Sequence, residues 1–181
     1  LSFDNPSNGL ILDGGEEQIF SRTGSGTSEI DILTINNGNG VTIPAGFSEF
    51  LIGKELRMQR GVFSLTGNLL EMAEGATFTP VNSFGESNMI VTGGAFSNFG
   101  LKLNIPANST DDIFVPLGID RYMPINLDFS APGYSSGTTA SSYLLRLNIP
   151  ECPVVIQDVE PVPPQINDLN NVLGMFFSID G

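Results

Sequence analysis

Short apolar runs recur roughly every 8–12 residues along most of this chain, and turn-forming residues separate them. Residues 36–40, Asn-Asn-Gly-Asn-Gly, give one such turn, because Asn and Gly tolerate left-handed φ angles. No run alternates with an amphipathic helical pattern of about ten residues, which disfavours a parallel α/β fold. The spacing therefore predicts an all-β protein, built as a sandwich, a barrel or a solenoid.

The expected strands are short apolar runs or period-two alternations bounded by turns. They comprise residues 9–12, 18–20, 29–35, 41–43, 47–52, 61–65, 68–72, 76–79, 89–92, 94–96, 100–105 and 142–149. Residues 49–59 also fit a helix, but Gly53 lies inside this window and we favour a strand. Residues 101–106 and 145–150 have similar sequences, which we interpret as two edge strands rather than a true repeat.

Residues 113–129, IFVPLGIDRYMPINLDF, predict an antiparallel hairpin. Pro116 and Pro124 lack an amide donor, so we expect each at a strand end, an edge or a bulge. Gly118 can supply a positive φ angle where the chain turns. Five apolar side chains on one phase of the hairpin are expected to point into one core: Phe114, Leu117, Ile125, Leu127 and Phe129.

The predicted fold is all-β, with short solenoid-like strand rows followed by an antiparallel β-sandwich. We expect an N-terminal β segment at residues 1–60, a β module at residues 61–150 and a Pro-rich linker at residues 151–166. Residues 167–181 are expected to start a further β unit. Their apolar run, residues 172–179, would then contact a partner chain or sequence beyond Gly181 more than the rest of the chain. The chain opens at Leu1, so we expect a processed or excised piece of a longer protein.

Charge and composition exclude several classes of function. The formal net charge of −13 disfavours nucleic acid and anionic membranes as partners, because phosphate binding depends on Lys and Arg. No apolar run approaches the ~20 residues of a membrane helix, so membrane insertion is not expected. The sequence has no His and only one Cys, Cys152, which excludes Ser–His and Cys–His catalysis and zinc sites with those ligands.

Carboxylates are the remaining candidates for chemistry. A glycosidase needs two of them facing one cleft, and nothing in the sequence shows such a pair converging. Asp111, Asp112 and Asp120 flank the hairpin and are candidate calcium ligands, since hard cations prefer oxygen donors. A second group of side chains with oxygen donors lies near the N-terminus and comprises Asp4, Asn5, Asn8 and Asp13. Neither group matches an EF-hand loop or a nonapeptide repeat, and solvated loop acids are the simpler interpretation.

Four elements together resemble a known family. Residues 62–79 look like rows of the form strand, Asn-Leu, strand, Gly-Ala-Thr in large cell-surface proteins of gliding Bacteroidetes. Residues 88–93 and 100–105 resemble their "YVVTNGTG…LKR" element, and FVPLGIDRYMPINLDF resembles their "FPVG…YSPVTLTF" hairpin. DLNNVLGMFFSID, at residues 168–180, is similar to their "NNVLQYYWTV" strand, although this chain has no Trp.

The order of these elements covers residues 62–181. The resemblance implies a module of a gliding-motility adhesin that is exported by the type IX secretion system and located at the cell surface, in association with the outer membrane. The resemblance implies no catalytic residues, and calcium is the only candidate cofactor. We therefore expect a non-enzymatic adhesive or structural display module, whose partners are a surface polysaccharide or protein and the secretion or motility machinery. Two alternatives stay open: a β-helical carbohydrate-active enzyme or carbohydrate-binding module, and a cargo or partner subunit of a secretion machine.

Overall fold

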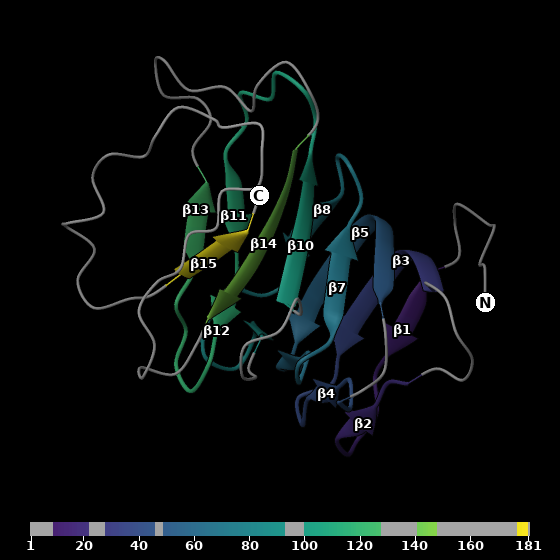
Figure 1. The fold of residues 1–181 in the computed structure, drawn as a ribbon. Helices are drawn as coiled ribbons and strands as arrows, with labels where there is room; N and C mark the ends of the chain where they lie inside the picture. Colours follow the sequence, from purple (N-terminus) through teal and green to yellow (C-terminus); the bar gives the residue numbers. More distant parts are fainter. Residues whose placement is uncertain are drawn as a thin grey trace.

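The structure is a computed structural model that describes residues 9–21, 28–45, 49–92, 100–127, 141–147 and 177–180, the last two segments as backbone only. Every regular element within these residues is a β-strand, and the strands follow one another from the purple β1 to the yellow β15 (Figure 1). The prediction of an all-β fold is confirmed. The window at residues 49–59 that also fitted a helix is a strand, β5 (Phe50–Arg60).

The larger sheet has eight strands. In spatial order they are β1 (Leu10–Leu12), β3 (Ser28–Asn36), β5, β7 (Leu69–Met72), β10 (Gly100–Ile105), β14 (Ser141–Leu147) and β15 (Phe177–Asp180), with β8 (Thr77–Pro80) also paired to β5. Neighbouring strands from β1 to β10 are parallel. The pairs β10–β14 and β14–β15 are antiparallel, so the parallel part of the sheet is followed by an antiparallel part.

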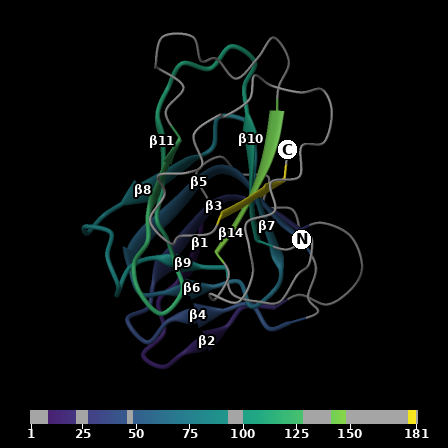
Figure 2. The same ribbon diagram turned by 60° about the vertical axis from the view of Figure 1, so that its left-hand side comes forward.

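A second sheet of five short strands is parallel throughout. It comprises β2 (Gln18–Ile19), β4 (Val41–Thr42), β6 (Phe63–Ser64), β9 (Ile90–Val91) and β12 (Leu117–Gly118). Figure 2 shows β2, β4, β6 and β9 stacked in this order. The chain alternates between the two sheets as it advances, so it winds as a β-solenoid. The predicted solenoid-like rows are confirmed, and they stack without a break across residue 60 as far as β12.

The first rows have nearly equal lengths, which places apolar residues above one another. Leu10 pairs in register with Leu33, and Leu33 pairs with Leu56, so both offsets are 23 residues. In the second sheet, Val41 pairs with Phe63 at an offset of 22 residues. Leu33, Leu56, Val41 and Phe63 are fully buried. Each row therefore covers the apolar interior of the row before it, which a single row could not bury alone.

Buried asparagines connect the corners of successive rows. They are Asn37, Asn68 and Asn88. The side-chain amide of Asn68 donates to three main-chain carbonyl oxygens, of Ile43, Pro44 and Leu65, at 3.1, 3.0 and 2.6 Å. Because two of these carbonyls belong to the preceding row, this one side chain links two rows at a corner.

The predicted hairpin forms, but it is divided between two sheets. β11 (Ile113–Val115) pairs antiparallel with β13 (Ile125–Leu127), and Pro116 lies between β11 and β12, at a strand end as expected. The expectation for Gly118 is wrong, because this residue lies inside β12 and its φ angle is not positive. Glycine is required there by packing: a Cβ atom would overlap the sulfur of Met89 and come within 2.7 Å of the carbonyl oxygen of Arg121.

The core prediction for the hairpin is correct for three of its residues. Leu117 is fully buried, and Ile125 and Leu127 are partly buried against the core. The prediction is wrong for Phe114, which is 43% exposed, because Val115 takes the inward position of β11 instead. Phe129 lies outside the described residues.

The C-terminal strand pairs within this chain. β15 is an antiparallel neighbour of β14, with Ile179 opposite Leu145, so the expectation that this run would rather contact a partner or later sequence is wrong for residues 177–180. Residues 167–176 lie outside the described part. The two similar strands, β10 and β14, are direct antiparallel neighbours with Leu101 opposite Leu145, and both lie inside the sheet rather than at its edge.

Candidate functional site

A pocket of about 520 Å³ lies between the solenoid rows and the hairpin. We call it the Phe84–Phe114 pocket. It is lined by the following residues: Gly75, Ala76, Thr77, Phe78, Pro80, Phe84, Asn104, Pro106, Ser109, Asp111, Asp112, Ile113 and Phe114. These residues come from β8 with the turn before it and the loop after it, from the end of β10, and from the segment that leads into β11 together with β11 itself. Its volume is within the range of small-molecule and side-chain binding sites.

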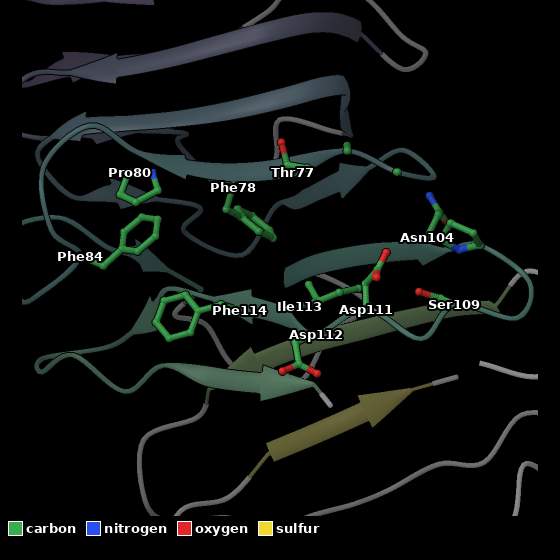
Figure 3. Close-up of a pocket in the computed structure, with 13 residues that line it drawn as sticks. Thr77, Phe78, Pro80, Phe84, Asn104, Ser109, Asp111, Asp112, Ile113 and Phe114 are labelled. Carbon is green, nitrogen blue, oxygen red and sulfur yellow. The ribbon is translucent and has the colours of Figure 1, made fainter. Parts of the chain in front are cut away.

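One side of the pocket is aromatic. The rings of Phe84 and Phe114 are stacked, with their centroids 5.7 Å apart and their planes at 27°. Phe114 reaches this position because it takes the outward phase of β11, opposite Asn126 and away from the core. Figure 3 shows Phe78 and Pro80 near the same end, so the apolar lining is continuous there.

The opposite end of the pocket is polar. Figure 3 shows the carboxylate of Asp111 directed toward the side where Thr77 and Asn104 lie, whereas the carboxylate of Asp112 points the other way. The amide of Asn104 is held in place, because it donates to Oε1 of Glu71 at 2.7 Å and to the carbonyl oxygen of Met72 at 3.0 Å. The pocket thus combines stacked rings at one end with a carboxylate and an anchored amide at the other.

No lysine or arginine is among the described residues that line the pocket. Basic side chains form ion pairs beside or away from the lining: Lys54 with Asp31, Arg57 with Glu55, and Arg121 with Asp120. Lys102 pairs with Oε1 of Glu71, the same atom that accepts from the pocket-lining Asn104. The pocket lining therefore carries negative formal charge and no positive charge.

The ion pair of Glu55 and Arg57 shifts the titration of both groups. A side-chain hydrogen bond from Arg57 holds the pKa of the Glu55 carboxyl below its ordinary value, and burial opposes this effect in part. The same hydrogen bond raises the pKa of Arg57. Burial raises the pKa of the Tyr122 phenol, which lies in the segment between β12 and β13.

The structure does not bring the three candidate calcium ligands together. Asp111 and Asp112 line the pocket with their carboxylates directed apart. The side chain of Asp120 is 73% exposed, and its Oδ1 lies 3.6 Å from Nε of Arg121. Across the part of the chain that the structure describes, no group of three acidic, His or Cys side chains has the geometry to hold a metal ion. Asp4, Asn5 and Asn8 of the N-terminal group lie outside that part.

The aromatic side of the pocket was missed by sequence reasoning. Phe84 lies in a polar loop, Ser83-Phe84-Gly85, where no strand was expected, and Phe114 was assigned to the core. An isolated large apolar residue in a Gly- and Ser-rich loop is the one signal that could have indicated the site. Nothing local to residue 84 indicates that residue 114, 30 positions later, lies beside it.

Among the described residues there is no helix long and apolar enough to cross a bilayer. No protein-family model, curated protein or solved structure matches this chain significantly.

Proposed function

We propose that this chain is a non-enzymatic module of a cell-surface adhesin, in which a stiff β-solenoid presents the Phe84–Phe114 pocket to a partner outside the cell. The observation that carries this proposal is the stacking of parallel rows around one continuous buried interior, from Ile30 to Leu117. Such stacked rows give an extended scaffold that holds its side chains at fixed positions. A binding site on a rigid scaffold loses little conformational entropy when a partner binds.

The resemblance of residues 62–181 to modules of gliding Bacteroidetes adhesins supplies the biological setting. It favours export by a type IX secretion system, location at the outer surface, and a role in surface adhesion or gliding. The net charge of −13 suits a soluble surface module that repels nucleic acid and anionic membranes.

The geometry of the pocket favours binding over hydrolysis. The two neighbouring carboxylates, Asp111 and Asp112, are directed apart, whereas a glycosidase places two carboxylates on either side of one bond. This arrangement supports the binding module over the carbohydrate-active enzyme.

Two experiments test the proposal. Protease treatment of intact cells that produce the protein should remove it, because an external module is accessible from outside. Protection of the protein until the outer membrane is permeabilised would contradict the proposed location. In the second experiment, purified protein is incubated with a panel of polysaccharides and assayed for new reducing ends or unsaturated products. Turnover that disappears in Asp111→Asn or Asp112→Asn would show that the protein is an enzyme.

A further inference from the structure

We propose that the Phe84–Phe114 pocket binds an extended segment of a partner protein through two of its side chains, an apolar one at the ring end and a basic one at Asp111. This inference rests on the proposed role as a binding module and identifies what the module recognises. Two different groups of the ligand are required, because the rings and the Asp111 carboxylate lie at opposite ends of the pocket.

The ring end is an accessible apolar surface on a firmly held loop. Phe114 is 43% exposed, and its ring stacks on that of Phe84. The loop that carries Phe84 is closed by reciprocal backbone hydrogen bonds between Gly85 and Asn88, at 3.2 and 2.9 Å. The side chain of Asn82 also donates to a main-chain carbonyl oxygen of β5 at 2.5 Å. Rings held in this way lose little conformational entropy on binding, so they favour an apolar side chain that is removed from water against them.

The other end of the pocket favours a cation. Asp111 lines it, and among the ion pairs of the described residues none includes this carboxylate. Lys102 is paired with Glu71 at 3.0 Å, so this pair adds no net positive charge beside the pocket. The overall charge of −13 adds long-range attraction for a basic partner. Because Asp111 is exposed to water, the apolar end should supply the larger share of the binding free energy.

The separation of the two ends favours alternate residues of an extended ligand. Asp111 and Phe114 are three positions apart, so their Cα atoms are at most about 11 Å apart. In an extended segment, residues i and i+2 point to the same side and lie about 7 Å apart, and long side chains cover the remaining distance. Figure 3 shows Ile113 between the two ends, where the ligand would pass. A volume of about 520 Å³ has room for two side chains.

A neutral glycan is the alternative occupant. It would lie on the same rings, but it would gain nothing from the charge of Asp111. The two kinds of ligand therefore predict different responses when a positive charge is removed from the probe or the negative charge from the protein.

The test is an amide-detected NMR titration of the whole chain with four probes. They are a capped Gly-Phe-Ser-Lys-Gly peptide, the same peptide with acetyl-lysine for Lys, the same peptide with Ala for Phe, and maltohexaose. Acetyl-lysine is the matched neutral analogue, because it keeps the stem of lysine and loses the charge. We expect the lysine peptide to shift the amides of Phe84, Asp111 and Phe114. The acetyl-lysine peptide should bind about threefold more weakly and the Ala peptide about tenfold more weakly, and maltohexaose should give no shift.

The variants separate the two ends. Asp111→Asn should weaken binding of the lysine peptide about threefold and leave the acetyl-lysine peptide unaffected. Asp112→Asn makes the same change in net charge, but this carboxylate points the other way, so it should have a smaller effect. Phe114→Ala should weaken both peptides about fivefold, whereas Ile19→Ala, at a residue that is 63% exposed on β2, should weaken neither. Unchanged melting temperatures would show that the variants are folded, and the altered peptides test both contacts on the unaltered protein.

Equal binding of the lysine and acetyl-lysine peptides would overturn the proposal, and so would equal binding of the Phe and Ala peptides. Shifts at another surface, preferential binding of maltohexaose, or no shift with millimolar lysine peptide would overturn it too. The outcome is separable from the proposed function: a protease-accessible surface module that ignores these peptides contradicts only this inference. A protein that is protected inside intact cells contradicts the proposed function, whatever its pocket binds.

Discussion

Replacing Gly61 by alanine should destabilise the protein by about 2–6 kcal/mol. Gly61 follows β5 at a corner between the two sheets and has a φ angle of +106°. A Cβ atom at this position would overlap the carbonyl oxygen of Asn37 in the preceding row and lie 2.7 Å from its carbonyl carbon. That oxygen already accepts the turn hydrogen bond from the amide of Gly40, at 2.9 Å. The substitution therefore forces apart two rows that are in contact through backbone atoms.

The magnitude has two parts. A non-glycine residue at a sparsely populated positive φ angle costs about 1–3 kcal/mol. Displacing well-packed neighbours to admit one extra carbon costs about 1–3 kcal/mol more, and here the neighbour is backbone, which cannot rotate away. The amide of Gly61 donates to the carbonyl oxygen of Ser87 at 3.0 Å, so movement of residue 61 would also weaken its contact with the next row.

Gly67→Ala is the matched control. Gly67 has a φ angle of +75°, but a Cβ atom there would meet nothing within 4 Å. This variant isolates the backbone strain, which we expect to cost about 1–2 kcal/mol. Urea unfolding followed by far-UV circular dichroism measures both, provided that the denaturant dependence of the free energy is unchanged. Equal destabilisation by the two substitutions would refute the argument, because it would show that the predicted contact with Asn37 has no cost.

Leu117→Ala should lower the free energy of unfolding by about 2–5 kcal/mol, since its side chain is fully buried, whereas Phe114→Ala should change it by less than about 1 kcal/mol; similar urea midpoints for the two variants would contradict the assignment of their faces. Asn68→Ala should cost about 1–3 kcal/mol, because the carbonyls of Ile43 and Pro44 in the preceding row lose the hydrogen bond from its side chain, and thermal unfolding would measure it. The pKa of Glu55 is lowered by Arg57, so its carboxylate contributes stability above its ordinary pKa of 4.5, and this contribution is lost as the pH falls below that value. Glu55→Gln should therefore make the melting temperature fall less steeply as the pH drops below 4.5. The effect should be weak, because the ion pair is partly exposed. The same dependence of melting temperature on pH in both proteins would argue against the pairing.

The positions of the strands were largely predictable from sequence. Alternation and turn chemistry act within a few residues, so runs such as residues 100–105 and 29–35 identified β10 and β3 without tertiary information. The turn at residues 36–40 was predictable for the same reason, and Gly40 does take a positive φ angle of +92°. The positions of the two prolines in the hairpin also follow from local chemistry, because a missing amide donor is a property of the residue itself.

The sequence predicted solenoid-like rows, but the register in which the rows stack could not be predicted from it. The residues that occupy one inward position differ in identity, as in Val41, Phe63 and Ile90, and the offset between them changes from 22 to 27 residues. Because neither the spacing nor the residue type at the inward position recurs, the sequence shows no repeat. The similar sequences of residues 101–106 and 145–150 belong to antiparallel neighbours and not to successive rows.

Sequence alone determined that this chain forms short strands with glycine and asparagine turns, and that it carries a formal net charge of −13. The tertiary structure decided which face each strand buries at the hairpin, why Gly118 must be glycine, and that Phe84 and Phe114 stack at one end of a pocket that Asp111 also lines. The physical reason is the range of the forces involved. Backbone preference and alternation are local, whereas a pocket depends on the register between rows, which is set by packing among residues more than 20 positions apart.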